Sequence, residues 1–302
     1  MFLILVSSFV QYPFTKSNLL LESFDGIIES GKLAIVHDSS FSLARKSLLK
    51  SLKDKGVKFF EYEAIDLKSP EHKLAKSLGL KHSLRCVPNF KEAHRVLSFD
   101  CDFLGHREAD NIASSRSFMS GRKILSPSDT DSMNRLYSVE SDLTLTGGVA
   151  DHRLRISASR MEAIAALTLS ELYKINGNAK NNVLKLLDEL AEPEKQNLKW
   201  IQNCVKDLVN SPKNSLVLAG NHLPANVQLL VYAINKSLQN IGTTVEYISI
   251  DEPGSLELSQ LQEFVEKGTI TSLLFLGGNP VYSAPFINWS EISTKLEQSF
   301  RL

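Results

Sequence analysis

The fold is decided by a strand and the loop that ends it, Ser272-Leu273-Leu274-Phe275-Leu276-Gly277-Gly278-Asn279-Pro280. A short apolar run is typical of a buried parallel strand, and a polar loop after it lies at the sheet edge where α/β proteins bind ligands. Two other apolar runs precede this strand. The first, Ser215–Ala219, leads into an expected helix, and the second, 244–248, follows that helix. The stretch therefore predicts an α/β unit that cradles a ligand.

The same order of elements occurs earlier in the chain, with apolar runs at 33–36, 58–62 and 95–99. Between the first two runs we expect a helix that Ser40 or Ser42 caps and Gly56 ends, a pattern that indicates a β-α-β crossover between parallel strands. Its inward-facing positions are predicted to be Leu43, Leu48, Leu49 and Leu52. The predicted fold class is α/β, with two related, doubly wound, mainly parallel β-α-β units joined by a helical segment.

The pattern predicts four parts: an N-terminal segment (1–29), a first α/β unit (30–150), a helical connection (151–212) and a second α/β unit (213–302). In the connection, Ser159 and Glu162 have the spacing of a capping box. The apolar start of the chain lacks the basic residues and cleavage site of a signal peptide, so we interpret it as a strand or as the start of a fragment.

Composition excludes several classes of function. The 302 residues include 34 Lys plus Arg and 34 Asp plus Glu, so no net charge favours nucleic acid or an anionic membrane. The three cysteines, Cys86, Cys101 and Cys204, lack the spacing of an iron–sulfur or structural zinc site. No apolar stretch is long enough for a direct membrane span. The chain is expected to ligate no metal.

The loop Gly277-Gly278-Asn279-Pro280 is the first candidate cofactor-binding site. The two glycines let main-chain amides approach a phosphate closely, and Asn279 is kept out of the α region by the proline that follows it. A plain turn with the same residues is the alternative interpretation. The loop is neither a Walker loop nor a G-x-G-x-x-G motif.

Asp100 and Asp102 occupy the equivalent position in the first half and are the second candidate. Two carboxylates so spaced could bind a hard cation or act as acid and base, or they could be solvated strand-end groups or helix caps. A further polar group follows the strand at 136–139, where His152 could be a base or a ligand, or have a structural role. Because no nucleophile motif is present, no catalytic residue is assigned.

Three segments resemble the molybdopterin oxidoreductase-like half of the large iron–sulfur subunit of alternative complex III. The central one runs from Met133 through Gly147-Gly148 to Ala150-Asp151-His152-Arg153-Leu154, and the others are 95–105 and 277–285. The resemblance extends over roughly residues 20 to 302. The central segment is fairly specific to this family, whereas Gly-Asn-Pro alone recurs across molybdopterin enzymes.

The resemblance implies a bacterial, membrane-associated respiratory complex that oxidises quinol, with this subunit on the periplasmic face. Its partners would be cytochrome c and integral membrane quinol-binding subunits. In that family the molybdopterin is understood to be lost, and the iron–sulfur clusters lie in a C-terminal half that this chain does not contain. The chain is therefore expected to be an interior fragment that acts as scaffold without a cofactor of its own, truncated within the second α/β unit.

Two other classes remain open. The chain could belong to a genuine molybdopterin-guanine-dinucleotide oxidoreductase, with 277–279 holding part of the cofactor, although no metal-ligating residue is recognisable in a suitable setting. It could also be a small-molecule or nucleotide-binding α/β protein unrelated to redox chemistry.

Overall fold

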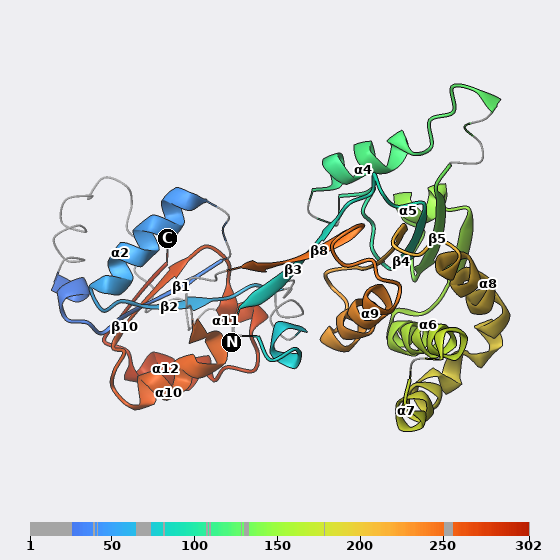
Figure 1. Ribbon diagram of the computed structural model, residues 1–302. Coiled ribbons are helices and arrows are strands. Elements are labelled where there is room, and N and C mark those ends of the chain that lie inside the picture. Colours follow the sequence, from blue (N-terminus) through green and yellow to red (C-terminus); the bar gives the residue numbers. More distant parts are fainter. Residues whose placement is uncertain are drawn as a thin grey trace. The chain divides into compact units, whose positions relative to one another are not determined.

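The computed structural model forms two compact units, and one is inserted into the other along the chain (Figure 1). Unit 1 consists of residues 1–66 and 252–302, and unit 2 is the continuous segment 67–251. The structure describes residues 26–38, 40, 42–64, 74–80, 82–106, 108, 110–127, 129, 133–177, 179–250 and 256–301.

The sheet of unit 1 has the order β11-β10-β1-β2-β9, and all its paired strands are parallel. Its middle strand is β1, which is buried along its whole length. Buried parallel strands have apolar side chains on both faces, which explains the continuous apolar runs in the sequence. The strands are β1 (Leu33–His37), β2 (Lys58–Glu61), β9 (Leu256–Glu257), β10 (Ser272–Leu276) and β11 (Gln298–Arg301).

Helices cover both faces of this sheet (Figure 1). On one face α2 (Leu43–Asp54) packs through Leu49 onto Ile35 and Phe59. The other face holds Val36 and Phe275 and packs on α10 and α12. The remaining bounds in unit 1 are η6 (Leu258–Gln260), α10 (Leu261–Glu266), α11 (Pro280–Ser283) and α12 (Trp289–Lys295).

Unit 2 contains a parallel sheet of order β6-β5-β4-β7 and a separate antiparallel ribbon of β3 and β8. The middle strands β4 and β5 are almost completely buried. The bounds are β3 (Ser83–Pro88), β4 (Arg95–Phe99), β5 (Arg135–Glu140), β6 (His152–Arg155), β7 (Ser215–Ala219) and β8 (Val245–Ile250).

One face of this sheet packs on helices α6 to α9, and the other on α4 and the β3–β8 ribbon. Phe90, Phe103 and Phe118 form an aromatic cluster on the second face, with two ring centroids 4.5 Å apart. The helices of unit 2 are α4 (Asn111–Ser120), α5 (Leu145–Val149), η4 (Ala158–Arg160), α6 (Met161–Asn176), α7 (Asn181–Ala191), η5 (Glu192–Asn197), α8 (Leu198–Val209) and α9 (Ala225–Ser237).

The β7 side of the sheet is closed by a side chain instead of a further strand. Asn235 of α9 is fully buried, accepts the N–H of Val217 at 3.1 Å and donates to the carbonyl of the same residue at 2.7 Å. Its amide thus makes the two bonds that a neighbouring strand would make. Asn240 donates to Asn235 in turn, at 2.9 Å.

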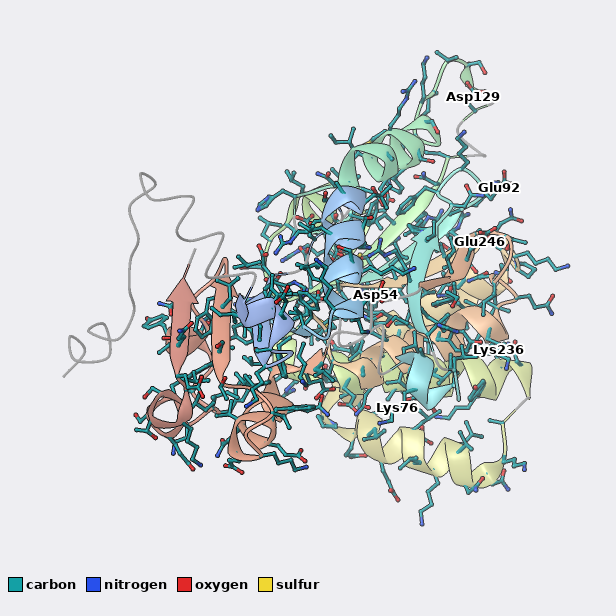
Figure 2. All side chains as sticks on the ribbon, turned by 90° about the vertical axis from the view of Figure 1, so that its left-hand side faces the viewer. Asp54, Lys76, Glu92, Asp129, Lys236 and Glu246 are labelled. Carbon is teal, nitrogen blue, oxygen red and sulfur yellow. The ribbon has the colours of Figure 1, made fainter. Side chains whose placement is uncertain are left out.

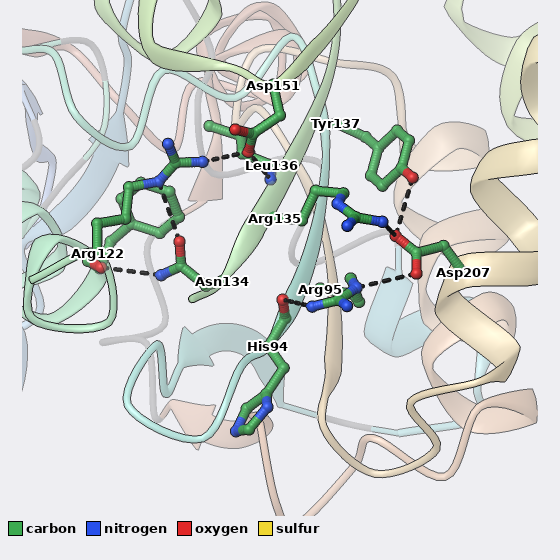
Figure 3. Close-up of polar contacts among 10 residues, drawn as sticks. His94, Arg95, Arg122, Asn134, Arg135, Leu136, Tyr137, Asp151 and Asp207 are labelled. Carbon is green, nitrogen blue, oxygen red and sulfur yellow. Dashed lines mark hydrogen bonds and ion pairs between the residues drawn. The ribbon is translucent and has the colours of Figure 1, made fainter. Parts of the chain in front are cut away.

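The amino ends of β4 and β5 are joined to α8 by a partly buried ion cluster (Figure 3). The Asp207 carboxylate accepts from Arg95 Nε at 2.9 Å, Arg135 Nη1 at 2.8 Å and the Tyr137 hydroxyl at 2.9 Å. Burial opposes ionisation of Asp207, but the Arg95 and Tyr137 hydrogen bonds outweigh it and lower the carboxyl pKa. These polar groups attach α8 to the sheet. The carboxyl ends of the strands, where α/β proteins bind ligands, lie at the opposite edge.

The predicted fold class is confirmed, since both larger sheets are parallel and covered by helices on both faces. The predicted boundaries at 30–150, 151–212 and 213–302 differ from the division into units. Strands β1 and β2 pair with β10, β11 and β9, whereas β4 pairs with β5 and β7. Apolar periodicity is the same in every buried parallel strand, so it does not specify the neighbours. Of the predicted N-terminal segment, 1–25 lie outside the described residues.

Two local predictions also require correction. Ser42 caps α2 as predicted, yet Leu43 and Leu48 are exposed, because only the side of α2 around Leu49 reaches the sheet. The capping box of Ser159 and Glu162 is absent, because a 3₁₀ turn precedes α6 and Glu162 accepts instead from Asn226 Nδ2 at 3.0 Å. Within the described residues, no helix is both long and apolar enough to cross a bilayer.

Candidate functional site

Each unit has a topological switch point, where the chain changes the direction in which it adds strands. In unit 1 the change occurs between β1 and β10, and in unit 2 between β4 and β7. Open α/β sheets bind ligands at the carboxyl ends of the strands beside such a point. The two loops predicted from sequence, at 277–280 and 100–102, lie at these two positions.

The switch point of unit 2 is centred on Asp100, which directly follows β4. Its φ of +47° is left-handed, a conformation that aspartate tolerates better than most residues. Its carboxylate accepts from the Ser141 hydroxyl at 2.9 Å, the Ser141 N–H at 3.3 Å and His222 Nε2 at 3.4 Å. Burial opposes ionisation, but the bonds from His222 and Ser141 prevail and lower the pKa of Asp100. The group is therefore a buried anion held by the chain itself.

Gly220, on the β7 side of the switch point, lies against Asp100. Its N–H donates to the Phe99 carbonyl at 2.9 Å, and a Cβ at this position would overlap the backbone oxygen of Asp100. The imidazole of His222 also lies close by, with Nδ1 2.9 Å from that Cβ position. Only glycine fits between these groups, so the two strand ends meet without space for a side chain.

Asp102 is buried but makes contacts separate from those of Asp100. It accepts from the Thr146 N–H at 3.1 Å and the Thr146 hydroxyl at 2.9 Å. A Cβ at Gly105 would overlap its carboxylate. Among the described residues, no group of three or more His, Cys, Asp or Glu side chains could hold a metal ion. The Asp102 carboxylate connects the loop after β4 to Thr146 of α5.

Three further polar groups at this edge were not predicted from the sequence. Glu108 accepts the Asn221 N–H at 3.2 Å, and burial raises the pKa of its carboxyl to about 7. Glu140, at the end of β5, is only 1% exposed and binds the Arg153 guanidinium and the Thr144 hydroxyl. The third is His222, which bonds to Asp100. Its position three residues after the strand 215–219 is a usable signal in the sequence, whereas Glu108 has no such local signal.

The polar group at 147–153 is distributed over the sheet instead of forming one site. A Cβ at Gly147 would overlap the Glu140 carboxylate. Asp151 accepts from the Leu136 N–H at 2.8 Å and pairs with Arg122 (Figure 3). The His152 ring stacks on Tyr137 at a centroid distance of 4.7 Å.

The switch point of unit 1 repeats the arrangement with fewer contacts. Asp38 directly follows β1, and a Cβ at Gly277 would lie 3.3 Å from its Cγ atom. Arg45 of α2 pairs with Asp38 at 2.6 Å, and both side chains are partly exposed. Gly277 and Gly278 have φ values of +79° and +65°, so the loop requires glycine for its backbone.

Asn279 is outside the α region, as predicted, with φ −141° and ψ 75°. Its carbonyl accepts the N–H groups of Tyr282 and Ser283, each at 3.0 Å, and so starts the short helix α11. The loop therefore has the backbone predicted for it, and its binding of a cofactor stays a prediction.

Comparisons with known proteins support the fold. No protein-family model matches the sequence, and no curated protein matches it either. Acetylene hydratase from Pelobacter acetylenicus is similar in structure, with a TM-score of 0.54 and 10% identity over 84% of this chain. The chain spans only 36% of that protein's length.

A second similar structure is a chain of the formyltransferase/hydrolase complex from Methylorubrum extorquens, solved in complex with methylofuran. The TM-score is 0.55 at 9% identity, over 91% of this chain and 78% of that one. At such identities the likeness extends to the fold alone.

Proposed function

We propose that this chain is a scaffold subunit of a membrane-bound, quinol-oxidising respiratory complex of the alternative complex III type. The proposal rests on the sequence resemblance and on one structural observation. In each unit an aspartate, Asp38 or Asp100, directly follows the central strand and faces the glycine of the neighbouring strand. Each aspartate thus lies at the sheet edge where a doubly wound fold binds a phosphate.

Molybdopterin cofactors bear phosphate groups, and these residues fit such a group poorly. Phosphates are bound by free main-chain N–H groups and by basic side chains. In unit 2 the buried carboxyl groups are those of Asp100, Asp102 and Glu140, and the Arg153 guanidinium is already paired with Glu140. In unit 1, Arg45 is paired with Asp38. The buried carboxyl groups of unit 2 would repel a phosphate, and in unit 1 the charge of Arg45 is already neutralised, which supports a scaffold whose cofactor has been lost.

In this proposal the chain contacts cytochrome c and integral membrane quinol-binding subunits at the periplasmic face. The iron–sulfur clusters and the electron transfer belong to other parts of the assembly. The loop 277–280 is a remnant of a cofactor site, and Asp100 and Asp102 connect loops instead of binding a ligand.

The experiment is to tag the full-length gene product in its own host and purify it from membranes. We expect it to co-purify with haem-containing and integral membrane subunits, to oxidise an added quinol, and to contain iron without molybdenum or pterin. Stoichiometric molybdenum with pterin would refute the scaffold proposal in favour of a molybdopterin enzyme. A lone, iron-free chain from a complete reading frame would favour a small-molecule-binding protein.

A further inference from the structure

The segment that follows α4 projects from unit 2 and ends in exposed apolar side chains. In two views 90° apart it extends beyond α4, away from the sheet, as far as Asp129 (Figures 1 and 2). Leu125 is 79% exposed, Ile124 47% and Met119 42%. We call residues 119–129 the arm, and its described part excludes residue 128. Single exposed apolar residues are common, but a group of three on a projecting segment points to an interaction site.

The base of the arm is held firmly on unit 2 (Figure 3). Arg122 donates from Nε to Asn134 Oδ1 at 3.0 Å, pairs with Asp151, and lies 5.2 Å from the Phe118 ring centroid. Asn134 in turn donates to the Phe118 carbonyl at 2.9 Å. The arm therefore begins at a fixed position and direction relative to the sheet.

The tip of the arm is held by its own hydrogen bonds. Asp129 Oδ2 accepts the N–H groups of Leu125 and Ser126, each at 2.8 Å. These backbone bonds lower the pKa of Asp129 and so keep it ionised. Leu125 is thus presented in a defined turn, and an ordered contact segment loses little entropy on binding.

The charges of the arm indicate the chemistry of its partner. The Arg122 guanidinium is paired with Asp151, and the Asp129 carboxylate is directed to the N–H groups of the turn. Within the described part of the arm, the exposed Lys123 directly precedes Ile124 and Leu125 and gives this end a positive charge. A complementary surface is apolar at its centre and has carboxylates at its rim.

We infer that the arm docks into an apolar, acid-rimmed surface on another subunit of the assembly, with Ile124 and Leu125 inserted and Lys123 facing the rim. The inference rests on the proposed function, because it requires an assembly with other subunits. Beyond the proposed function, the inference names the part of this chain that contacts another subunit and the chemistry of the surface on that subunit.

The test uses the full chain in its own host, with the photo-crosslinking residue benzoylphenylalanine in place of Leu125. We expect irradiation to join position 125 to one other subunit, at a stretch that contains apolar residues and Asp or Glu. The cross-link should weaken severalfold as salt is raised and be lost when Lys123→Glu or Ile124→Asp is added. The matched control carries the same probe at Leu186, a 57% exposed leucine of α7 in the same unit.

The outcomes separate the inference from the proposed function. If the assembly purifies intact but position 125 gives no cross-link, or Lys123→Glu has no effect, the arm is not the docking surface and the proposed function stands. A cross-link to a second copy of this chain, or to a basic stretch, would overturn the inference as well. If the chain purifies alone, the proposed function fails and the inference fails with it.

Discussion

The two switch points share one plan but differ in how completely they are filled. Each has an aspartate after the central strand and a glycine on the neighbouring strand. In unit 2 the Asp100 side chain is 3% exposed and is bound by Ser141 and His222. In unit 1 the Asp38 side chain is 47% exposed and forms an ion pair with Arg45. The comparison shows that, with the same topology, the carboxyl ends of the strands can be filled by buried, hydrogen-bonded polar groups or left open to solvent.

The largest expected effect comes from adding a methyl group at each switch point. We expect Gly220→Ala to destabilise unit 2 by about 3 kcal/mol, because its Cβ would overlap the backbone of Asp100. At Gly277 a Cβ would lie 3.3 Å from the Cγ atom of the partly exposed Asp38 side chain, which can shift, so Gly277→Ala should cost only about 1 kcal/mol, from its left-handed backbone. Denaturant unfolding followed by hydrogen exchange in each unit measures both values. Equal costs would contradict the difference in packing.

The second comparison removes the charge of each aspartate. Asp100→Asn should cost about 2 kcal/mol, since an amide donates where the carboxylate accepts from Ser141 and His222. Asparagine tolerates the left-handed backbone, so the substitution isolates the charge. Asp38→Asn should cost at most about 1 kcal/mol, because the ion pair with Arg45 is partly exposed. The same unfolding assay measures both values. A larger loss of stability from Asp38→Asn than from Asp100→Asn would mean that the switch point of unit 1 is the more tightly held of the two.

The third prediction concerns pH and involves unit 2 alone. The folded pKa of Glu108 is raised to about 7 from 4.5, so the folded state binds more protons than the unfolded state between these values. The contribution of Glu108 is therefore fully present below pH 4.5 and is lost as pH rises through 7. We expect unit 2 to lose roughly 1 to 2 kcal/mol between pH 6 and 8 from this group. Glu108→Gln should flatten the profile, and an unchanged slope would show that other groups cause it.

The smallest effect is expected at the open switch point. Arg45→Ala should destabilise unit 1 by about 0.5 kcal/mol at low salt, and less at high ionic strength, because the pair with Asp38 is screened by solvent. Unfolding of the variant and the parent at two salt concentrations measures this. A cost of several kcal/mol that is independent of salt would mean that the unit 1 switch point is as tightly held as that of unit 2.

Much of this comparison was accessible from the sequence. Apolar runs followed by polar loops located both switch points, because buried parallel strands require apolar side chains on both faces. They also indicated the loop 277–280 and the pair Asp100 and Asp102. The fold class followed from the order of strands and helices.

The remainder depends on non-local pairing. The pairing of β1 with β10 joins residues more than two hundred positions apart, and no local pattern encodes it. The contacts of Glu108 with Asn221 and of Asp100 with His222 span 113 and 122 positions. These contacts hold the switch point of unit 2 together, so the residues that meet there could be identified only from the structure.

The insertion of unit 2 within unit 1 has a consequence for the order of folding during synthesis. Unit 2 is one continuous segment, so all its strands have been made when residue 251 has left the ribosome. In unit 1, β1 and β2 are made first, but β10 and β11 come only with the last 31 residues of the sequence. Domains generally fold as units as they emerge. The switch point of unit 1 therefore forms only after all strands of unit 2 have been made, and until then β1 lacks its partner β10.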